Sequence, residues 1–156
     1  MPRIKKILAP TDFSELSKLG LRYALEMARD ENAEVIVYHA IDLSADWVER
    51  RADYRPDRDL LEQSRRVLDK FLAANFADCI NLVEVRQVVQ FGAPYKNIVE
   101  EAASEGVDMI VMSTHGRTGV DHLMLGSIAE KVVARAPCPV LIVPRRGREG
   151  TTAKAA

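Results

Sequence analysis

The sequence predicts an α/β domain: a doubly wound, five-stranded parallel sheet with helices on both faces. Short apolar runs alternate along the chain with longer segments of helical period, which is the pattern of a parallel sheet covered on both sides. The second run is continuous and rich in β-branched residues, as a buried parallel strand is. At 156 residues the chain has the length of one domain with a single core.

The first strand and the first helix are expected before residue 31. The run IKKILAP is closed by Pro10, and Ser14 is a suitable N-cap for a helix over 14–30. Apolar residues recur in this helix at steps of three and four, as an amphipathic helix requires: Leu16, Leu19, Tyr23, Ala24, Met27 and Ala28.

The second strand and the second helix lie on either side of a charged segment. The strand is the continuous apolar run AEVIVYHAI, over residues 33–41. Residues 42–56 have no sustained period and are expected to form a loop, and a helix follows over 57–75. Its expected buried residues are Leu61, Val67, Leu68, Phe71 and Leu72.

A third strand is expected over 81–90, and Pro94 suits the first turn of the helix that follows. This helix is expected to run to about residue 104 and to be closed by Gly106. Its expected inward-facing residues are Ile98, Val99 and Ala102.

The last elements are a strand over 107–112, a helix over 127–136 and a strand over 139–144. We therefore expect the α/β domain to span residues 1–144. The basic, glycine-rich tail 145–156 is poor in apolar residues and is expected to be disordered.

Composition and charge predict a soluble, cytoplasmic protein that binds neither nucleic acid nor membrane. The formal net charge is −1, so the chain lacks the basic field of a nucleic-acid or membrane-surface binder. No window approaches the 18 apolar residues of a membrane span, and the N-terminal apolar stretch is too short for a signal peptide. Cys79 and Cys138 lack metal-site spacing, which indicates reduced thiols and no metal centre.

The predicted sheet places a binding site at the carboxyl ends of its strands. Ligands of doubly wound sheets bind outside the carboxyl ends of the strands, where the strand order reverses. With the first strand in mid-sheet and the fourth beside it, in the order 3-2-1-4-5, the site combines residues 9–12 with residues 112–127.

The segment STHGRTGVDHLMLGS, from Ser113 to Ser127, has the composition of a phosphate-binding loop. Its glycines let backbone N–H groups approach a ligand closely, and Gly126 opens a helix whose N-terminus favours an anion. The Ser127 hydroxyl can cap that helix or contact a phosphate. Neither a GK[ST] nor a G-x-G-x-x-G motif is present, so a purely architectural role for the glycines stays open. Three side chains in the segment offer cations or donors: His115, Arg117 and His122.

Four stretches of the chain resemble the universal stress protein family: ILAPTDFSELSKLGLRYALEMA, FGAPYKNIVEEA, THGRTG and LGSIAEKVVARAPCPVLIV. The resemblance covers residues 3–144. The ATP-binding branch of that family carries a signature of Gly, two residues, Gly, nine residues, then Gly followed by Ser or Thr. Gly116 and Gly126-Ser127 match it, whereas the first signature position is Ser113.

The resemblance implies a fold that binds adenine nucleotides: ATP, or ADP or AMP, with Mg²⁺ as a possible companion. It implies that Pro10, Thr11 and Asp12 contact the base and the ribose, and that Ala40 packs on the adenine. A carboxylate such as that of Asp12 suits sugar hydroxyls, although capping of the first helix is the alternative role for it. His39 is interpreted as a core histidine. The remaining implied contacts are Met112, Ser113, His115, Gly116, Arg117, Gly126, Ser127 and Ile128.

The final strand predicts a homodimer. An apolar strand at the edge of a sheet exposes unpaired backbone groups, and pairing with a second copy across a two-fold axis removes that liability. The resemblance implies the same arrangement. The strand residues concerned are Val140, Leu141, Ile142 and Val143.

The sequence shows no catalytic constellation, neither a nucleophile elbow nor paired carboxylates on one element. Together with this absence, the family resemblance implies an ATP-binding, stress-response regulatory homodimer, which is our expectation. Two alternatives stay open: a dimeric interaction module without nucleotide binding, and a slow ATPase. Nucleotide titration separates the first alternative from our prediction, and phosphate release above background separates the second.

Overall fold

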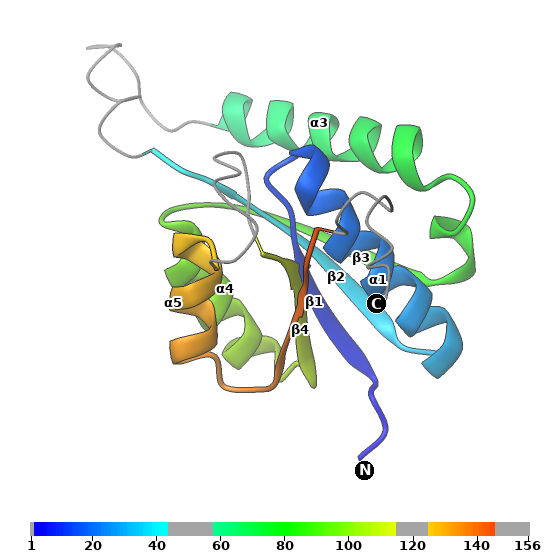
Figure 1. The fold of residues 1–156 in the computed structure, drawn as a ribbon. Coiled ribbons are helices and arrows are strands. Elements are labelled where there is room, and N and C mark those ends of the chain that lie inside the picture. Colours follow the sequence, from blue (N-terminus) through cyan, green and yellow to red (C-terminus); the bar gives the residue numbers. More distant parts are fainter. Residues whose placement is uncertain (1, 44–57, 115–124, 146–156) are drawn as a thin grey trace, which may run out of the picture.

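The structure is a computed structural model that describes residues 2–43, 58–114 and 125–145. In these parts the chain forms a parallel sheet in the order β3-β2-β1-β4-β5, which confirms the predicted fold class and strand order (Figure 1). The elements are β1 (Lys6–Pro10), α1 (Glu15–Glu31), β2 (Glu34–Ile41), α3 (Arg58–Phe76), the 3-10 turn η1 (Ile80–Leu82), β3 (Glu84–Phe91), α4 (Pro94–Glu105), β4 (Met109–Ser113), α5 (Ser127–Arg135) and β5 (Val140–Val143).

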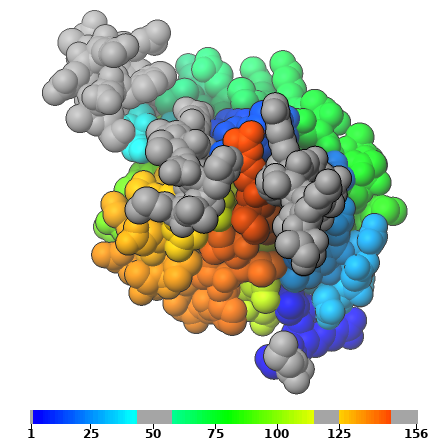
Figure 2. Space-filling view, viewed as in Figure 1, coloured from blue at the N-terminus to red at the C-terminus, as the bar shows by residue number. Residues whose placement is uncertain are grey.

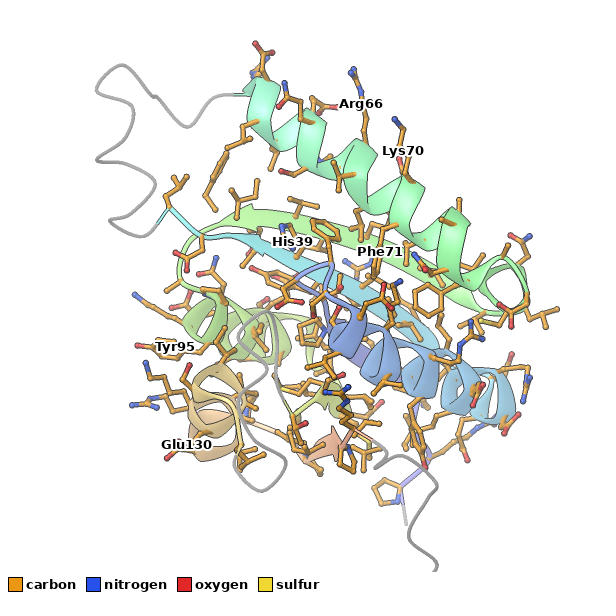
Figure 3. All side chains as sticks on the ribbon, turned by 45° about the horizontal axis from the view of Figure 1, so that its top comes forward. His39, Arg66, Lys70, Phe71, Tyr95 and Glu130 are labelled. Atoms are coloured by element: carbon orange, nitrogen blue, oxygen red, sulfur yellow. The ribbon has the colours of Figure 1, made fainter. Side chains whose placement is uncertain are left out.

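The helices cover the two faces of the sheet in pairs, α1 with α3 and α4 with α5 (Figure 1). A hydrophobic core lies on each face of the sheet. Alternate residues of the central strands belong to one core or the other, because successive side chains of a strand point to opposite faces. Ile7 of β1 packs with α1 and α3, whereas its neighbour Leu8 packs with α4 and α5. Phe71 of α3 points toward the sheet and Arg66 and Lys70 point away from it (Figure 3).

The helix ends follow the predicted capping residues. The Ser14 hydroxyl accepts the Ser17 backbone N–H at 3.1 Å and so caps α1. Pro94 occupies the first turn of α4, and Gly106 ends that helix in the left-handed conformation at φ 60°. Left-handed backbone costs a glycine little, which is why this residue type suits the position.

The apolar residues that recur along α1 do not all face the sheet. Leu19 and Tyr23 are exposed, at 37% and 47%, and the face toward the sheet includes the small residues Ser17 and Gly20. The reason is close approach: a Cβ on Gly20 would lie 2.7 Å from the backbone N of Ser113. Small residues therefore occupy the contact that an apolar periodicity assigns to large ones. Val67 of α3 is likewise exposed, whereas Leu68 and Leu72 are buried.

The third strand starts later than the sequence predicts. Residues Ile80–Leu82 form η1, in which the Leu82 N–H donates to the Cys79 carbonyl at 3.1 Å. The ladder with β2 begins where Glu84 faces Glu34, the first residue of β2, so the preceding residues have no strand to pair with. A local turn satisfies their backbone groups instead.

Strand β5 is the edge of the sheet, and it reaches the molecular surface in the space-filling view (Figure 2). Each of its residues is half-buried. Within the described parts of the chain, no helix is long and apolar enough to cross a membrane. Cys79 and Cys138 are free thiols, and burial raises the pKa of both.

Candidate functional site

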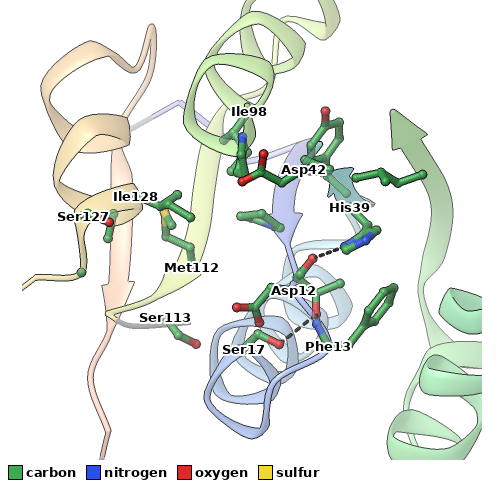
Figure 4. Close-up of a pocket in the computed structure, with 18 of the residues that line it drawn as sticks. Asp12, Phe13, Ser17, His39, Asp42, Ile98, Met112, Ser113, Ser127 and Ile128 are labelled. Atoms are coloured by element: carbon green, nitrogen blue, oxygen red, sulfur yellow. Dashed lines mark hydrogen bonds between the residues drawn. The ribbon is translucent and has the colours of Figure 1, made fainter. Parts of the chain in front are cut away.

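A cavity of about 580 Å³ opens at the carboxyl ends of the strands (Figure 4). Its wall combines the ends of β1, β2 and β4 with residues of α1, α3, α4 and α5. The predicted site residues that the structure describes all line it: Pro10, Thr11, Asp12, Ala40, Met112, Ser113, Gly126, Ser127 and Ile128. The other predicted residues, His115, Gly116 and Arg117, lie outside the described part of the chain.

The backbone after β1 is held by a chain of hydrogen bonds. The Ser17 hydroxyl donates to the Ser14 carbonyl and sits 2.8 Å from the Thr11 hydroxyl, which therefore donates to it. The Thr11 hydroxyl in turn accepts the Phe13 N–H at 3.1 Å, and the Thr11 N–H donates to the Tyr38 carbonyl at 2.8 Å. Thr11 and Ser17 are buried. The turn that presents Asp12 is thus fixed from both sides.

Asp12 has a local role as well as a position on the cavity wall. One of its carboxylate oxygens, Oδ1, accepts the Ser14 N–H at 3.0 Å. The N-cap of α1 is Ser14, so the alternative in which Asp12 itself caps the helix is not realised. A carboxylate held this way presents negative charge at the edge of the cavity, where hydroxyl donors of a ligand would find a strong acceptor.

Phe13 is one of the cavity-wall residues that the sequence did not predict. Its backbone is left-handed, at φ 66°, which costs a non-glycine residue on the order of 1–2 kcal/mol. The ring packs on His39, with centroids 4.1 Å apart, and edge-on against Phe71 at 5.4 Å. These ring contacts stabilise the left-handed backbone of Phe13. No sequence pattern predicts a phenylalanine with positive φ.

His39 is buried, as expected of a core histidine, and it also lines the cavity. Its Nδ1 lies 2.8 Å from the Thr11 carbonyl oxygen, which can only accept, so Nδ1 carries the proton. Beside it, burial raises the pKa of Tyr38 to about 12. The neutral Tyr38 hydroxyl donates to Oε1 of Gln90 at 2.9 Å.

The β4 and α5 side supplies the second half of the wall. The Gly126 N–H donates to the Thr114 carbonyl at 2.7 Å, so the end of β4 is joined directly to the start of α5. Gly126 is the N-cap of α5, so Ser127 is the first helical residue and its hydroxyl does not serve as the N-cap. The first N–H groups of a helix favour an anion. The Ser113 hydroxyl points toward α1 (Figure 4).

Several wall residues were missed because they come from elements outside the two strand ends considered. Asp42 and Leu43 follow β2, and the rule on carboxyl ends applies to that strand as well. Residues of α3 and α4 could be assigned only once the helices were placed in space. They are Leu60, Ser64, Pro94 and Ile98. Among the described residues, no group of three or more His, Cys, Asp or Glu could hold a metal ion.

The comparison with known proteins agrees with this architecture. The family model described as the universal stress protein family matches residues 3–144. The chain belongs to the universal stress protein family. A universal stress protein from Methanocaldococcus jannaschii is 33% identical over 149 residues, which cover 93% of this chain and 85% of that protein.

Solved structures of other family members extend this comparison. The structure of the M. jannaschii protein MJ0577 matches with a TM-score of 0.76 and 32% identity, covering 94% of this universal stress protein and 99% of that chain. A universal stress protein from Archaeoglobus fulgidus, solved in complex with dAMP, shares the fold at 21% identity. Its TM-score is 0.60, with 91% and 98% of the chains covered.

Proposed function

We propose that this protein is an adenine-nucleotide-binding regulatory protein of the stress response, that ATP is its ligand and that it acts as a homodimer. The observation that carries the proposal is the cavity itself. It brings Asp12, at the end of β1, to the same space as Met112 and the first residues of α5. These are the two halves of a nucleotide site in a doubly wound sheet.

Each half suits one part of a nucleotide. The Asp12 carboxylate accepts the ribose hydroxyls, and Ala40 and Ile98 offer apolar contact to the base. The N-terminus of α5 at Gly126 and Ser127 receives the phosphates of ATP, ADP or AMP, with or without Mg²⁺. The dAMP complex of the A. fulgidus family member supports an adenine base in this fold.

The homodimer is proposed to form by antiparallel pairing of β5 with its copy. Strand β5 is the sheet edge, and its residues Val140–Val143 are half-buried although they are apolar. Exposed Leu19 and Tyr23 add apolar surface on α1, the helix against which Leu141 and Val143 pack. Covering these groups removes apolar surface and unpaired backbone from water.

The test is calorimetric titration of the nucleotide-stripped protein with ATP, ADP and AMP, each with and without Mg²⁺. We expect micromolar binding of ATP, about −8 kcal/mol. Gly126→Asp should abolish it, since a carboxylate at the N-cap of α5 repels the phosphates, while φ −60° at Gly126 accepts a side chain. The matched control is Ser104→Asp, on an exposed position of α4 that does not line the cavity.

Absence of binding by the unaltered protein up to millimolar nucleotide would overturn the nucleotide part of the proposal. The position of β5 at the edge of the sheet favours one second candidate in that case, a dimeric interaction module that needs no nucleotide. Light scattering at micromolar concentration tests the dimer separately, because a monomer mass would overturn it whatever the calorimetry shows.

A further inference from the structure

Ser113, the last residue of β4, makes two hydrogen bonds to the backbone of α1. Its hydroxyl donates to the Leu16 carbonyl at 2.5 Å and accepts the Gly20 N–H at 2.9 Å. These two groups are four residues apart, and an α-helix pairs such groups with each other. One side-chain oxygen therefore joins the end of a central strand to the hydrogen-bond ladder of a helix that lies more than ninety residues earlier in the chain.

Gly20 makes this contact possible. A Cβ at this position would lie 2.7 Å from the backbone N of Ser113 and 2.8 Å from the carbonyl carbon of Met112. Helix α1 thus touches β4 at the level of the backbone, and the hydroxyl forms its bonds at the point of closest approach. Ser113 is buried there, with 8% of its surface exposed.

The part of α1 that Ser113 holds also holds the turn after β1. Ser14 caps the helix, and Ser17, in the turn that ends at Gly20, is hydrogen-bonded to Thr11. That turn supplies Asp12 to the cavity, whereas Ser113 belongs to the opposite half of the wall. A single hydroxyl consequently links the two halves.

We propose that Ser113 is a positioning residue, whose hydroxyl holds the two halves of the cavity in their binding arrangement before a nucleotide arrives. The inference rests on the proposed nucleotide-binding function. A preformed site binds more tightly because the ligand does not have to order it. Glycine at the first signature position would leave Leu16 and Gly20 to pair only with each other, and the halves would lose this link. Ser113 keeps negative φ, so the serine needs no strained backbone here.

The test is Ser113→Ala, which keeps the Cβ and removes the hydroxyl. We expect the Kd for ATP to rise about five-fold, the effect of one net hydrogen bond. In the nucleotide-free variant, hydrogen exchange at the amides of Phe13, Ser14 and Ser17 should accelerate by a similar factor. Ser113→Gly should weaken binding at least as much.

Two controls separate positioning from general stability. Ser104→Ala removes a hydroxyl that bonds within its own helix, to the Glu101 carbonyl at 3.2 Å, and should change neither measurement. Glu105→Gln weakens an ion-pair cluster with Arg86 at the amino ends of the strands, so it should lower Tm and leave the Kd unchanged.

The outcomes that overturn the inference are distinct from failure of the proposed function. A Kd that stays unchanged in Ser113→Ala while Tm falls would reduce Ser113 to a structural role. Unchanged amide exchange, or tighter binding by Ser113→Gly, would also refute the positioning role. If the unaltered protein binds no nucleotide, the proposed function and the positioning role both fall, and amide exchange then decides whether the link exists at all.

Discussion

The contact between α1 and β4 predicts a specific response to Gly20→Ala. The new Cβ would lie 2.7, 2.8 and 3.0 Å from three backbone atoms of Ser113 and Met112, none of which can rotate away. Ordinary carbon contact begins at about 3.5 Å, so α1 has to withdraw by about 0.8 Å. The bond between the Gly20 N–H and the Ser113 hydroxyl, now 2.9 Å, would then exceed hydrogen-bond length.

The free-energy change follows from three contributions. Overpacking of a buried contact costs about 1–3 kcal/mol, and the lost hydrogen bond adds about 1 kcal/mol. Alanine regains about 1 kcal/mol of helix propensity over glycine. We therefore expect a net loss of about 2 kcal/mol in the free energy of unfolding, which lowers Tm by about 4–8 °C in a domain of this size.

Urea unfolding and calorimetry measure both quantities, and Gly106→Ala is the matched control. Gly106 has φ +60° with nothing within 4 Å of its would-be Cβ, so alanine there suffers backbone strain alone, about 1 kcal/mol. Gly20→Ala should also weaken ATP binding, whereas Gly106→Ala should not. A Gly20→Ala protein as stable as the parent, or more stable through its helix propensity, would refute this account of the contact.

Three further predictions concern acid stability, assembly and the ligand. Hydrogen bonds from Arg86 hold the pKa of Glu105 below its ordinary value of 4.5, so its stabilisation is complete above that pH and is lost as pH falls through the lowered pKa. Urea titrations between pH 6 and about pH 2 should show this loss as a fall in the free energy of unfolding. In Glu105→Gln that free energy should depend less on pH, and an equal pH dependence in the two proteins would contradict the prediction. Tyr23→Lys should weaken the dimer in light scattering while the protomer still folds, because the side chain is 47% exposed, and an unaltered dimer would place the interface elsewhere. Asp12→Asn keeps an acceptor for the Ser14 N–H but loses the charge, so the Kd for ATP should rise about ten-fold, as for one charged hydrogen bond; unchanged calorimetry would remove Asp12 from the site.

The sequence predicted those features that have a local or periodic cause. Strand runs, the cap at Ser14, the first-turn proline at 94 and the helix-ending Gly106 are each signalled by a residue's own conformational preference. The meeting of β1 and β4 followed from the strand order, which is confirmed. The strand order and the strand ends together predict that the cavity lies at the carboxyl ends of β1 and β4.

Features that depend on distant partners could not be predicted in the same way. Gly20 is buried because β4 approaches it, and no periodicity within α1 contains that information. The left-handed backbone of Phe13 is held by rings on β2 and α3. Leu60 and Ser64 enter the cavity wall only because α3 crosses over it. Each is a consequence of packing between elements rather than of a residue's own preference.

The bond between the Gly126 N–H and the Thr114 carbonyl has a consequence for how the family can diversify. Thr114 and Gly126 are joined directly, and Thr114 is also bonded to the Val143 carbonyl through its own N–H at 3.2 Å. Doubling the length of a segment whose ends are already together costs only about 0.6 kcal/mol. The backbone bonds of Thr114 and Gly126 therefore do not depend on the length of the chain between them, and an insertion there leaves the hydrogen bonds of the sheet beneath in place.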